Sequence, residues 1–138
     1  RIPLELSYDL TVENYAKEVA GKIYLNLNID RTLNKSKVDI DDRKYSKKID
    51  YAFKKNYTTT FKIPEGYKIS HLPKTLSYDN TNYGFKISYE QKGNEIIQTK
   101  KIHINTLNIG NDEFESWNDF IKSLIKAYKK SITLEKNL

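Results

Sequence analysis

The sequence has 138 residues, of which 38% are hydrophobic and 30% charged, and its formal net charge is +6 at pH 7. This length and composition suit a single soluble domain with a core of its own. No cysteine is present, which excludes disulfides, thiolate metal sites and a cysteine nucleophile. No apolar run reaches the roughly 20 residues that cross a bilayer, so we expect no membrane insertion.

Lysine carries nearly all of the positive charge. Arg1, Arg31 and Arg43 are the only arginines among 24 basic residues. Proteins that read phosphates and base edges favour arginine, whose planar guanidinium binds two acceptors at once. We therefore expect a solvated, lysine-rich surface and no nucleic-acid partner. The chain opens at Arg1 without a visible secretory signal and contains no methionine, so we expect it to be a piece of a longer product.

The dominant period along the chain is two. Apolar side chains fall on every second position in five segments, which are residues 4–12, 23–29, 49–53, 57–63 and 83–89. Side chains on a strand point to opposite faces in turn, so each segment has one apolar and one polar face. This pattern is typical of antiparallel sheets with one side in water.

Polar and glycine-containing segments separate these predicted strands. Lys54-Lys55-Asn56 is predicted to be a hairpin turn, and Pro64-Glu65-Gly66 a tight turn in which Gly66 accepts a positive φ. Residues 79–82 and 92–94 are expected to join the next pairs of strands. Between residues 95 and 109 the apolar positions change from even to odd, which predicts a bulge or bend near Asn105.

One segment has the period of a helix. Its apolar stripe consists of Phe114, Trp117, Phe120, Ile121, Leu124, Ile125 and Tyr128. Asn111 or Asp112 is predicted to cap its start, because a short side-chain oxygen there can accept a free backbone N–H. The wide stripe predicts a helix that lies flat on a sheet with Trp117 and Leu124 buried. The alternation from Ile132 predicts a final short strand.

These elements predict a mostly β fold. We expect an antiparallel β-sandwich of about seven to nine strands with one C-terminal helix packed on a sheet. No repeat, linker or shift in composition divides the chain, so residues 1–138 are predicted to form one domain.

The residues that could carry chemistry are few. His71 and His103 have no partner at metal-ligand spacing and are predicted to be surface histidines. Residues 38–43 hold three close carboxylates without the glycine of a calcium loop, which predicts a solvated turn where Arg43 pairs with an aspartate. No phosphate loop or nucleophile motif is present. We predict no catalytic residue, metal or cofactor. A pair of carboxylates for glycoside cleavage, brought together by the fold from distant segments, remains an alternative.

Tyrosine is abundant, with 11 residues. Many of them, such as Tyr51, Tyr57 and Tyr89, share the apolar positions of their strands and are predicted to be partly buried. Tyr24 falls on a polar face, and Tyr78 and Tyr83 flank a loop. Because aromatic rings stack on sugars, these three residues form the candidate ligand surface.

The order of several short motifs points to a known family. Arg43 leads into a strand that ends in Ile63-Pro64-Glu65-Gly66-Tyr67, and Leu72-Pro73 and a strand around Phe85 follow. A long strand then precedes Glu113-Phe114-Glu115-Ser116-Trp117, and the chain closes with Ile132-Thr133-Leu134-Glu135-Lys136. From about Arg43 onward this order resembles the C-terminal β-domain of bacterial transglutaminase-like proteins, domain-of-unknown-function family 3858.

The resemblance implies an exported parent protein, periplasmic or extracellular. In such proteins a signal peptide, an N-terminal β-domain and a transglutaminase-like core with a Cys-His-Asp site precede this domain. None of the core's motif lies in this chain, so no catalytic residue is carried over. We therefore expect a non-catalytic accessory domain whose partners are the upstream domains, on which it docks or to which it presents substrate. The alternative is a glycan-binding module that uses its surface tyrosines.

Overall fold

The structure is a computed structural model that describes residues 3–4, 7, 9 and 11–138. The described part contains ten strands, one 3-10 helix and one α-helix. In chain order they are β1 (Lys17–Val19), β2 (Lys22–Leu25), β3 (Lys47–Lys48), β4 (Phe53–Lys62), β5 (Tyr67–His71), β6 (Leu76–Asp79), β7 (Tyr83–Lys92), β8 (Glu95–Ile104), β9 (Asn108–Ile109), η1 (Asn111–Glu113), α1 (Phe114–Tyr128) and β10 (Ile132–Lys136).

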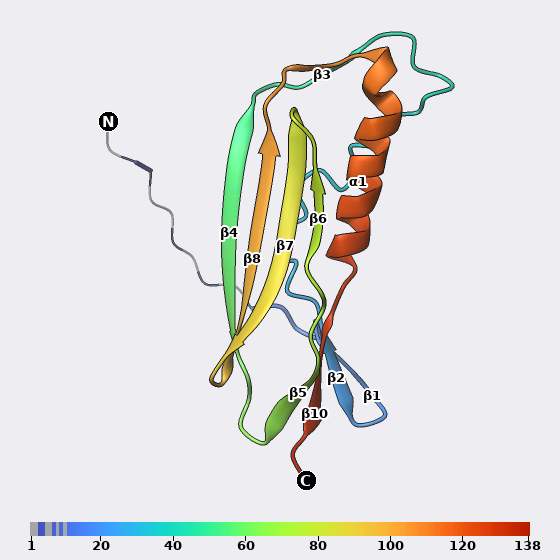
Figure 1. Cartoon of the computed structure of the whole chain (residues 1–138). Helices are drawn as coiled ribbons and strands as arrows, with labels where there is room; N and C mark the ends of the chain where they lie inside the picture. The colour runs from blue at the N-terminus through green and yellow to red at the C-terminus, as the bar shows by residue number, and fades with distance from the viewer. Residues whose placement is uncertain (1–2, 5–6, 8, 10) are drawn as a thin grey trace.

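Three ten-residue strands form the body of the molecule. The long sheet is antiparallel and has the order β4-β8-β7-β6 (Figure 1). At its upper end Ile104 of β8 lies opposite Phe53 and Tyr83, and at its lower end Glu95 lies opposite Lys62 and Lys92. Because β7 and β8 pair without a shift, their alternating apolar positions fall on one common face of the sheet.

A second sheet lies against the lower end of the long one and has the order β1-β2-β10-β5. The last strand, β10, therefore lies between two strands from much earlier in the chain. Ile132 pairs with Leu25 of β2, and Lys136 pairs with Tyr67 of β5. A short ribbon of β3 and β9 closes the upper end.

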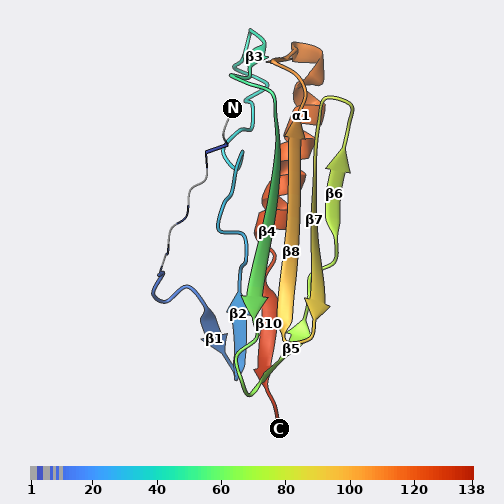
Figure 2. The same ribbon diagram turned by 90° about the vertical axis from the view of Figure 1, so that its left-hand side faces the viewer.

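The inner face of the long sheet is covered by two different elements. Helix α1 covers its upper part and the small sheet its lower part, so that helix and sheet share one packing surface (Figures 1 and 2). The upper core contains Tyr83, Phe85, Ile87, Ile102, Ile104, Trp117, Phe120 and Leu124. The lower core contains Leu27, Ile63, Ile96, Ile132 and Leu134. The mostly β fold with one C-terminal helix is confirmed, with ten strands where seven to nine were predicted.

Helix α1 follows the predicted stripe closely. Trp117 and Leu124 are fully buried, as predicted from their position in mid-stripe. The predicted cap is wrong, because the helix is preceded by the 3-10 turn η1 and neither Asn111 nor Asp112 caps it. Instead the Glu113 carboxylate accepts a hydrogen bond of 3.2 Å from the N–H of Gly110, and the Asn111 amide donates to the carbonyl of Lys44.

Most of the predicted turns are confirmed. Gly66 has a φ of 86° in the turn between β4 and β5, and residues 79–82 and 92–94 join the expected strands. The chain also leaves its strand after Ile104, next to the predicted bend at Asn105. The turn predicted at Lys54-Lys55-Asn56 is wrong, because these residues continue β4.

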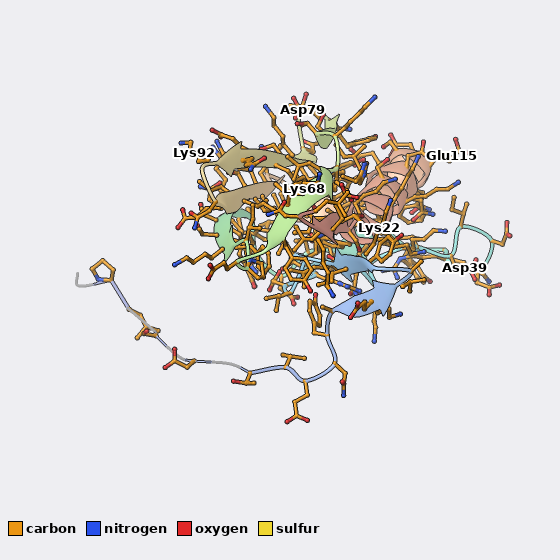
Figure 3. The ribbon with its side chains drawn as sticks, turned by 90° about the horizontal axis from the view of Figure 1, so that it is seen from below. Lys22, Asp39, Lys68, Asp79, Lys92 and Glu115 are labelled. Carbon is orange, nitrogen blue, oxygen red and sulfur yellow. The ribbon has the colours of Figure 1, made fainter. Side chains whose placement is uncertain are left out.

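The first predicted strand is only partly within the described residues. Leu4 and Val12 are described, belong to no strand and are exposed, whereas Leu6, Tyr8 and Leu10 lie outside the described residues. Viewed from below, charged side chains lie on the small sheet, among them Lys22 and Lys68, and at the margin of the domain, among them Glu115 (Figure 3). Among the described helices, none is long and apolar enough to cross a membrane.

Candidate functional site

Two of the three candidate tyrosines lie between the long sheet and α1. The surface position predicted for Tyr83 is wrong, because this side chain is fully buried. Its ring lies 5.2 Å from the Trp117 ring in an edge-on arrangement, and its hydroxyl shares a hydrogen bond of 2.6 Å with that of Ser116. Tyr78 is half-buried, stacks on Tyr83 and donates a hydrogen bond to the Ser116 carbonyl. Burial raises the pKa of both phenols.

Tyr24 lies elsewhere, in β2 of the small sheet. It is 40% exposed and is paired with Lys17 and Thr133 on the neighbouring strands. The three candidate tyrosines therefore belong to two sheets and do not join into one aromatic surface. The most exposed tyrosines in the described residues are Tyr45 and Tyr51. The partial burial predicted for Tyr51 from its strand position is therefore wrong, because residues 49–52 belong to no strand.

The structure places an unexpected row of polar side chains inside the domain. On the inner face of β8, Gln98 and Lys100 stand between apolar neighbours and are each 2% exposed. They lie where the upper and lower cores meet, beside the buried Asn28 and the end of α1 at Tyr128. We call these four residues, together with Asp30, the polar seam.

Amide groups complete one half of the polar seam. Gln98 donates hydrogen bonds of 2.9 Å to the side-chain oxygen of Asn28 and 3.1 Å to the Tyr89 hydroxyl. Asn28 in turn donates to the side-chain oxygen of Asn26, and Asn26 donates a 2.7 Å bond to the backbone carbonyl of Tyr128. This chain of bonds satisfies a carbonyl at the C-terminal end of α1 and ties residues 26–28 to both helix and sheet.

Lys100 forms the other half. Its ammonium donates to the backbone carbonyl of Asp30 and lies 3.7 Å from the Asp30 carboxylate. The rings of Tyr57 and Tyr128 lie 4.5 Å and 5.0 Å from the nitrogen, so two aromatic faces stabilise the charge. Burial lowers the pKa of Lys100, and Asp30 opposes this shift. The Lys100 side chain is only 3% exposed. We interpret the polar seam as the set of contacts that holds residues 26–32 against the long sheet and α1.

The remaining predicted site residues are spread over the surface. His71 is exposed at the end of β5, and His103 is half-buried on β8 with its Nε2 atom 3.9 Å from the Asp79 carboxylate. Among the described residues, no group of three or more His, Cys, Asp or Glu side chains could hold a metal ion.

The ion pair predicted for Arg43 is wrong. Its guanidinium donates instead to the carbonyls of Tyr45 and Ser46, at 3.0 and 3.1 Å, and no carboxylate of the described residues forms a salt bridge with it. These bonds close the loop locally, because the planar fork of the guanidinium spans two neighbouring carbonyl groups.

The comparison with known proteins identifies the family. A family model described as "Domain of Unknown Function with solved-structure structure (DUF3858)" matches residues 21–134. The chain belongs to the DUF3858 family. The match begins at residue 21, whereas the resemblance seen in the sequence begins at about Arg43. The matched range therefore includes all residues of the polar seam.

One solved structure shares the fold of this DUF3858 domain. It is described as the crystal structure of a "putative protease" from Parabacteroides distasonis ATCC 8503, with 12% sequence identity and a TM-score of 0.68. The similarity covers 84% of this chain and 24% of that one, so the DUF3858 domain spans about a quarter of the matched protein. No curated protein matches the chain.

Part of the polar seam could have been predicted from the sequence of the DUF3858 domain, because two of its residues are polar side chains at inward-facing strand positions. Gln98 and Lys100 occupy the same even positions as Ile96, Ile102 and Ile104, which are the inward-facing positions of the strand. A lysine at such a position needs hydrogen-bond partners inside the core. The partners come from residues 28–30 and from Tyr57, Tyr89 and Tyr128, so their identity could not be read from the strand itself.

Proposed function

We propose that this DUF3858 domain is a non-catalytic accessory domain of a longer, exported transglutaminase- or protease-like protein, where it docks on the catalytic core or presents its substrate. The observation that carries the proposal is the extent of the structural match. The same fold occurs as about a quarter of a longer chain described as a "putative protease". The other parts of the parent are then the partners of this domain.

The side chains of the domain support a role without catalysis. The sequence contains no cysteine, and its two histidines lie on different sheets. His103 and Asp79 line one surface hollow together with Ser77. A nucleophilic serine needs a hydrogen bond to its base. Among the described residues, no hydrogen bond joins Ser77 to His103, and the Asp79 side chain is 88% exposed.

The glycan-binding alternative receives no comparable support. It depended on an aromatic surface made by Tyr24, Tyr78 and Tyr83. Tyr83 is buried under α1, and Tyr24 belongs to the other sheet. We therefore favour the accessory role.

Two assays test the proposed function. The isolated chain should show no turnover in amine-incorporation and peptide-cleavage assays. Turnover that His71→Ala or His103→Ala abolishes would overturn the proposal. In the parent protein, deletion of residues 21–134 should lower substrate capture or thermal stability while the catalytic residues stay intact. An unchanged parent would count against the accessory role.

A further inference from the structure

The outer face of the long sheet carries a cluster of basic side chains at its upper end. This face points away from α1, and no other described element lies over it in Figure 2. The register places Lys101 of β8 directly opposite Lys86 of β7, and His103 directly opposite Gly84. On the other side of β8, Lys54 of β4 lies opposite His103. We call Lys54, Lys86, Lys101 and His103 the basic cluster.

The three lysines of this cluster form no salt bridge within the described residues. Like charges directly opposite one another destabilise a sheet. No carboxylate of the described residues lies within 4.0 Å of the nitrogen of Lys54, Lys86 or Lys101. The arrangement therefore places repelling ammonium groups side by side without an internal partner.

The lower end of the same face is arranged differently. Glu95 of β8 lies between Lys62 and Lys92 on the two neighbouring strands. Lys92 also lies 3.7 Å from the Glu90 carboxylate. The lysines at the lower end of the face therefore have carboxylates on neighbouring positions, and those at the upper end do not. The basic cluster is a local feature of the upper end.

A hollow lies beside the cluster, next to Gly84, where His103 and the carbonyl of Tyr78 leave no room for a side chain. A Cβ atom at Gly84 would lie 2.7 Å from Cε1 of His103 and 2.7 Å from the carbonyl oxygen of Tyr78. The hollow is lined by Ser77, Asp79, Lys86, Lys101 and His103, among other residues. Asp79 stands at the rim 3.9 Å from His103, so one carboxylate already approaches the histidine.

We propose that this hollow is the docking site for an acidic polypeptide segment, whose carboxylates pair with Lys86, Lys101 and His103. The assignment of that segment to the catalytic part of the parent rests on the proposed function above. The donors are lysine ammonium groups and an imidazole N–H, which bind carboxylates through single hydrogen bonds and, for lysine, a single charge. Ser77 and Asn56, next to Lys86 and Lys101 in the register, add neutral groups for the amides of the segment.

Binding of a hexaglutamate peptide to the isolated chain tests the site. The amide signals of residues 84–86 and 101–103 should shift on titration in NMR spectra at low salt. The double variant Lys86→Thr/Lys101→Thr should bind at least about tenfold more weakly. Lys62→Thr/Lys92→Thr is the matched control, because it removes the same charge from the compensated end of the same face. It should bind like the wild type.

Several outcomes would overturn the site. They are no binding of hexaglutamate, equal weakening in both double variants, or binding of hexaglutamine as tight as that of hexaglutamate. Tighter binding of inorganic tripolyphosphate than of the peptide would also overturn a polypeptide ligand. Because the substitutions relieve repulsion between lysines, Lys86→Thr/Lys101→Thr should melt no lower than the wild type, which separates lost binding from lost folding.

The deletion in the parent keeps the two proposals distinguishable. If the peptide fails to bind but deletion of residues 21–134 impairs the parent, only the docking site is wrong. If the peptide binds at the cluster but the deletion changes nothing, the site stands and the accessory role fails.

Discussion

Replacement of Trp117 by alanine tests whether α1 is an integral part of the core. Trp117 is fully buried, and its ring lies 5.2 Å from that of Tyr83 and 5.4 Å from that of Phe120. Its indole N–H donates a 2.7 Å hydrogen bond to the carbonyl of Ser36. The side chain therefore joins the helix to the sheet and also to the segment before β3.

The expected loss follows from these contacts. Truncation of a buried tryptophan to alanine destabilises a protein by about 3–5 kcal/mol, because apolar burial is lost and a cavity is left. Trp117→Phe keeps most of the ring packing and loses mainly the hydrogen bond, so it should cost about 1–2 kcal/mol. Domains of this kind are stable by only about 5–15 kcal/mol, so Trp117→Ala should unfold at a much lower denaturant concentration.

Urea unfolding followed by far-UV circular dichroism measures both variants without relying on tryptophan fluorescence. A free-energy loss below about 1 kcal/mol for Trp117→Ala would refute the reasoning, because it would show that the stripe of α1 faces solvent or a partner. An equal loss for alanine and phenylalanine would instead show that the hydrogen bond to Ser36, and not the ring packing, dominates.

Three further predictions concern other parts of the domain. Burial raises the pKa of Tyr128 above its ordinary value of 10.0, so the folded state holds this proton more tightly and stability is lost as the pH rises above that value. The urea midpoint of Tyr128→Phe should accordingly fall less than that of the wild type between neutral pH and about pH 11. Gly84→Ala should destabilise the domain by about 1–3 kcal/mol, because the new Cβ meets the backbone of β6. The control Ser88→Ala on the same strand should change stability by less than about 0.5 kcal/mol in the same urea assay. Purified protein should contain no stoichiometric zinc or calcium in elemental analysis, and calcium should bind no more tightly than millimolar in calorimetry; a stoichiometric metal would contradict the ligand spacing.

The sequence predicted those elements whose packing follows a simple period. Residues 83–89 alternate on one strand, and the stripe from Phe114 to Tyr128 fits one helix face, so both were found. The hairpin turn predicted at Lys54-Lys55-Asn56 was wrong, because three consecutive polar residues are typical of turns as well as of exposed strands. In the structure the Lys55 ammonium lies 4.9 Å over the Phe53 ring, and the strand continues. A long lysine side chain can cover apolar surface while its charge stays accessible to water.

The candidate site was harder to predict because its residues depend on contacts between distant segments. Tyr83 flanks a loop in sequence, but it is buried because α1 packs over the end of β7. Lys100 occupies an inward position, and its partners Asp30 and Tyr57 come from two earlier segments. Such partners are fixed only when the layers come together, and no local pattern encodes them.

The position of β10 has a consequence for how the domain is made. Its neighbours β2 and β5 are complete long before residues 132–136 leave the ribosome, and until then both present open edges toward each other. The small sheet must therefore close after synthesis of β10, which pairs with β5 about 65 residues earlier and with β2 about 110 residues earlier. Contacts between segments so far apart in sequence are slow to form. A nascent chain that stalls before Ile132 would expose two unsatisfied strands, and such edges are where misassembly between chains begins.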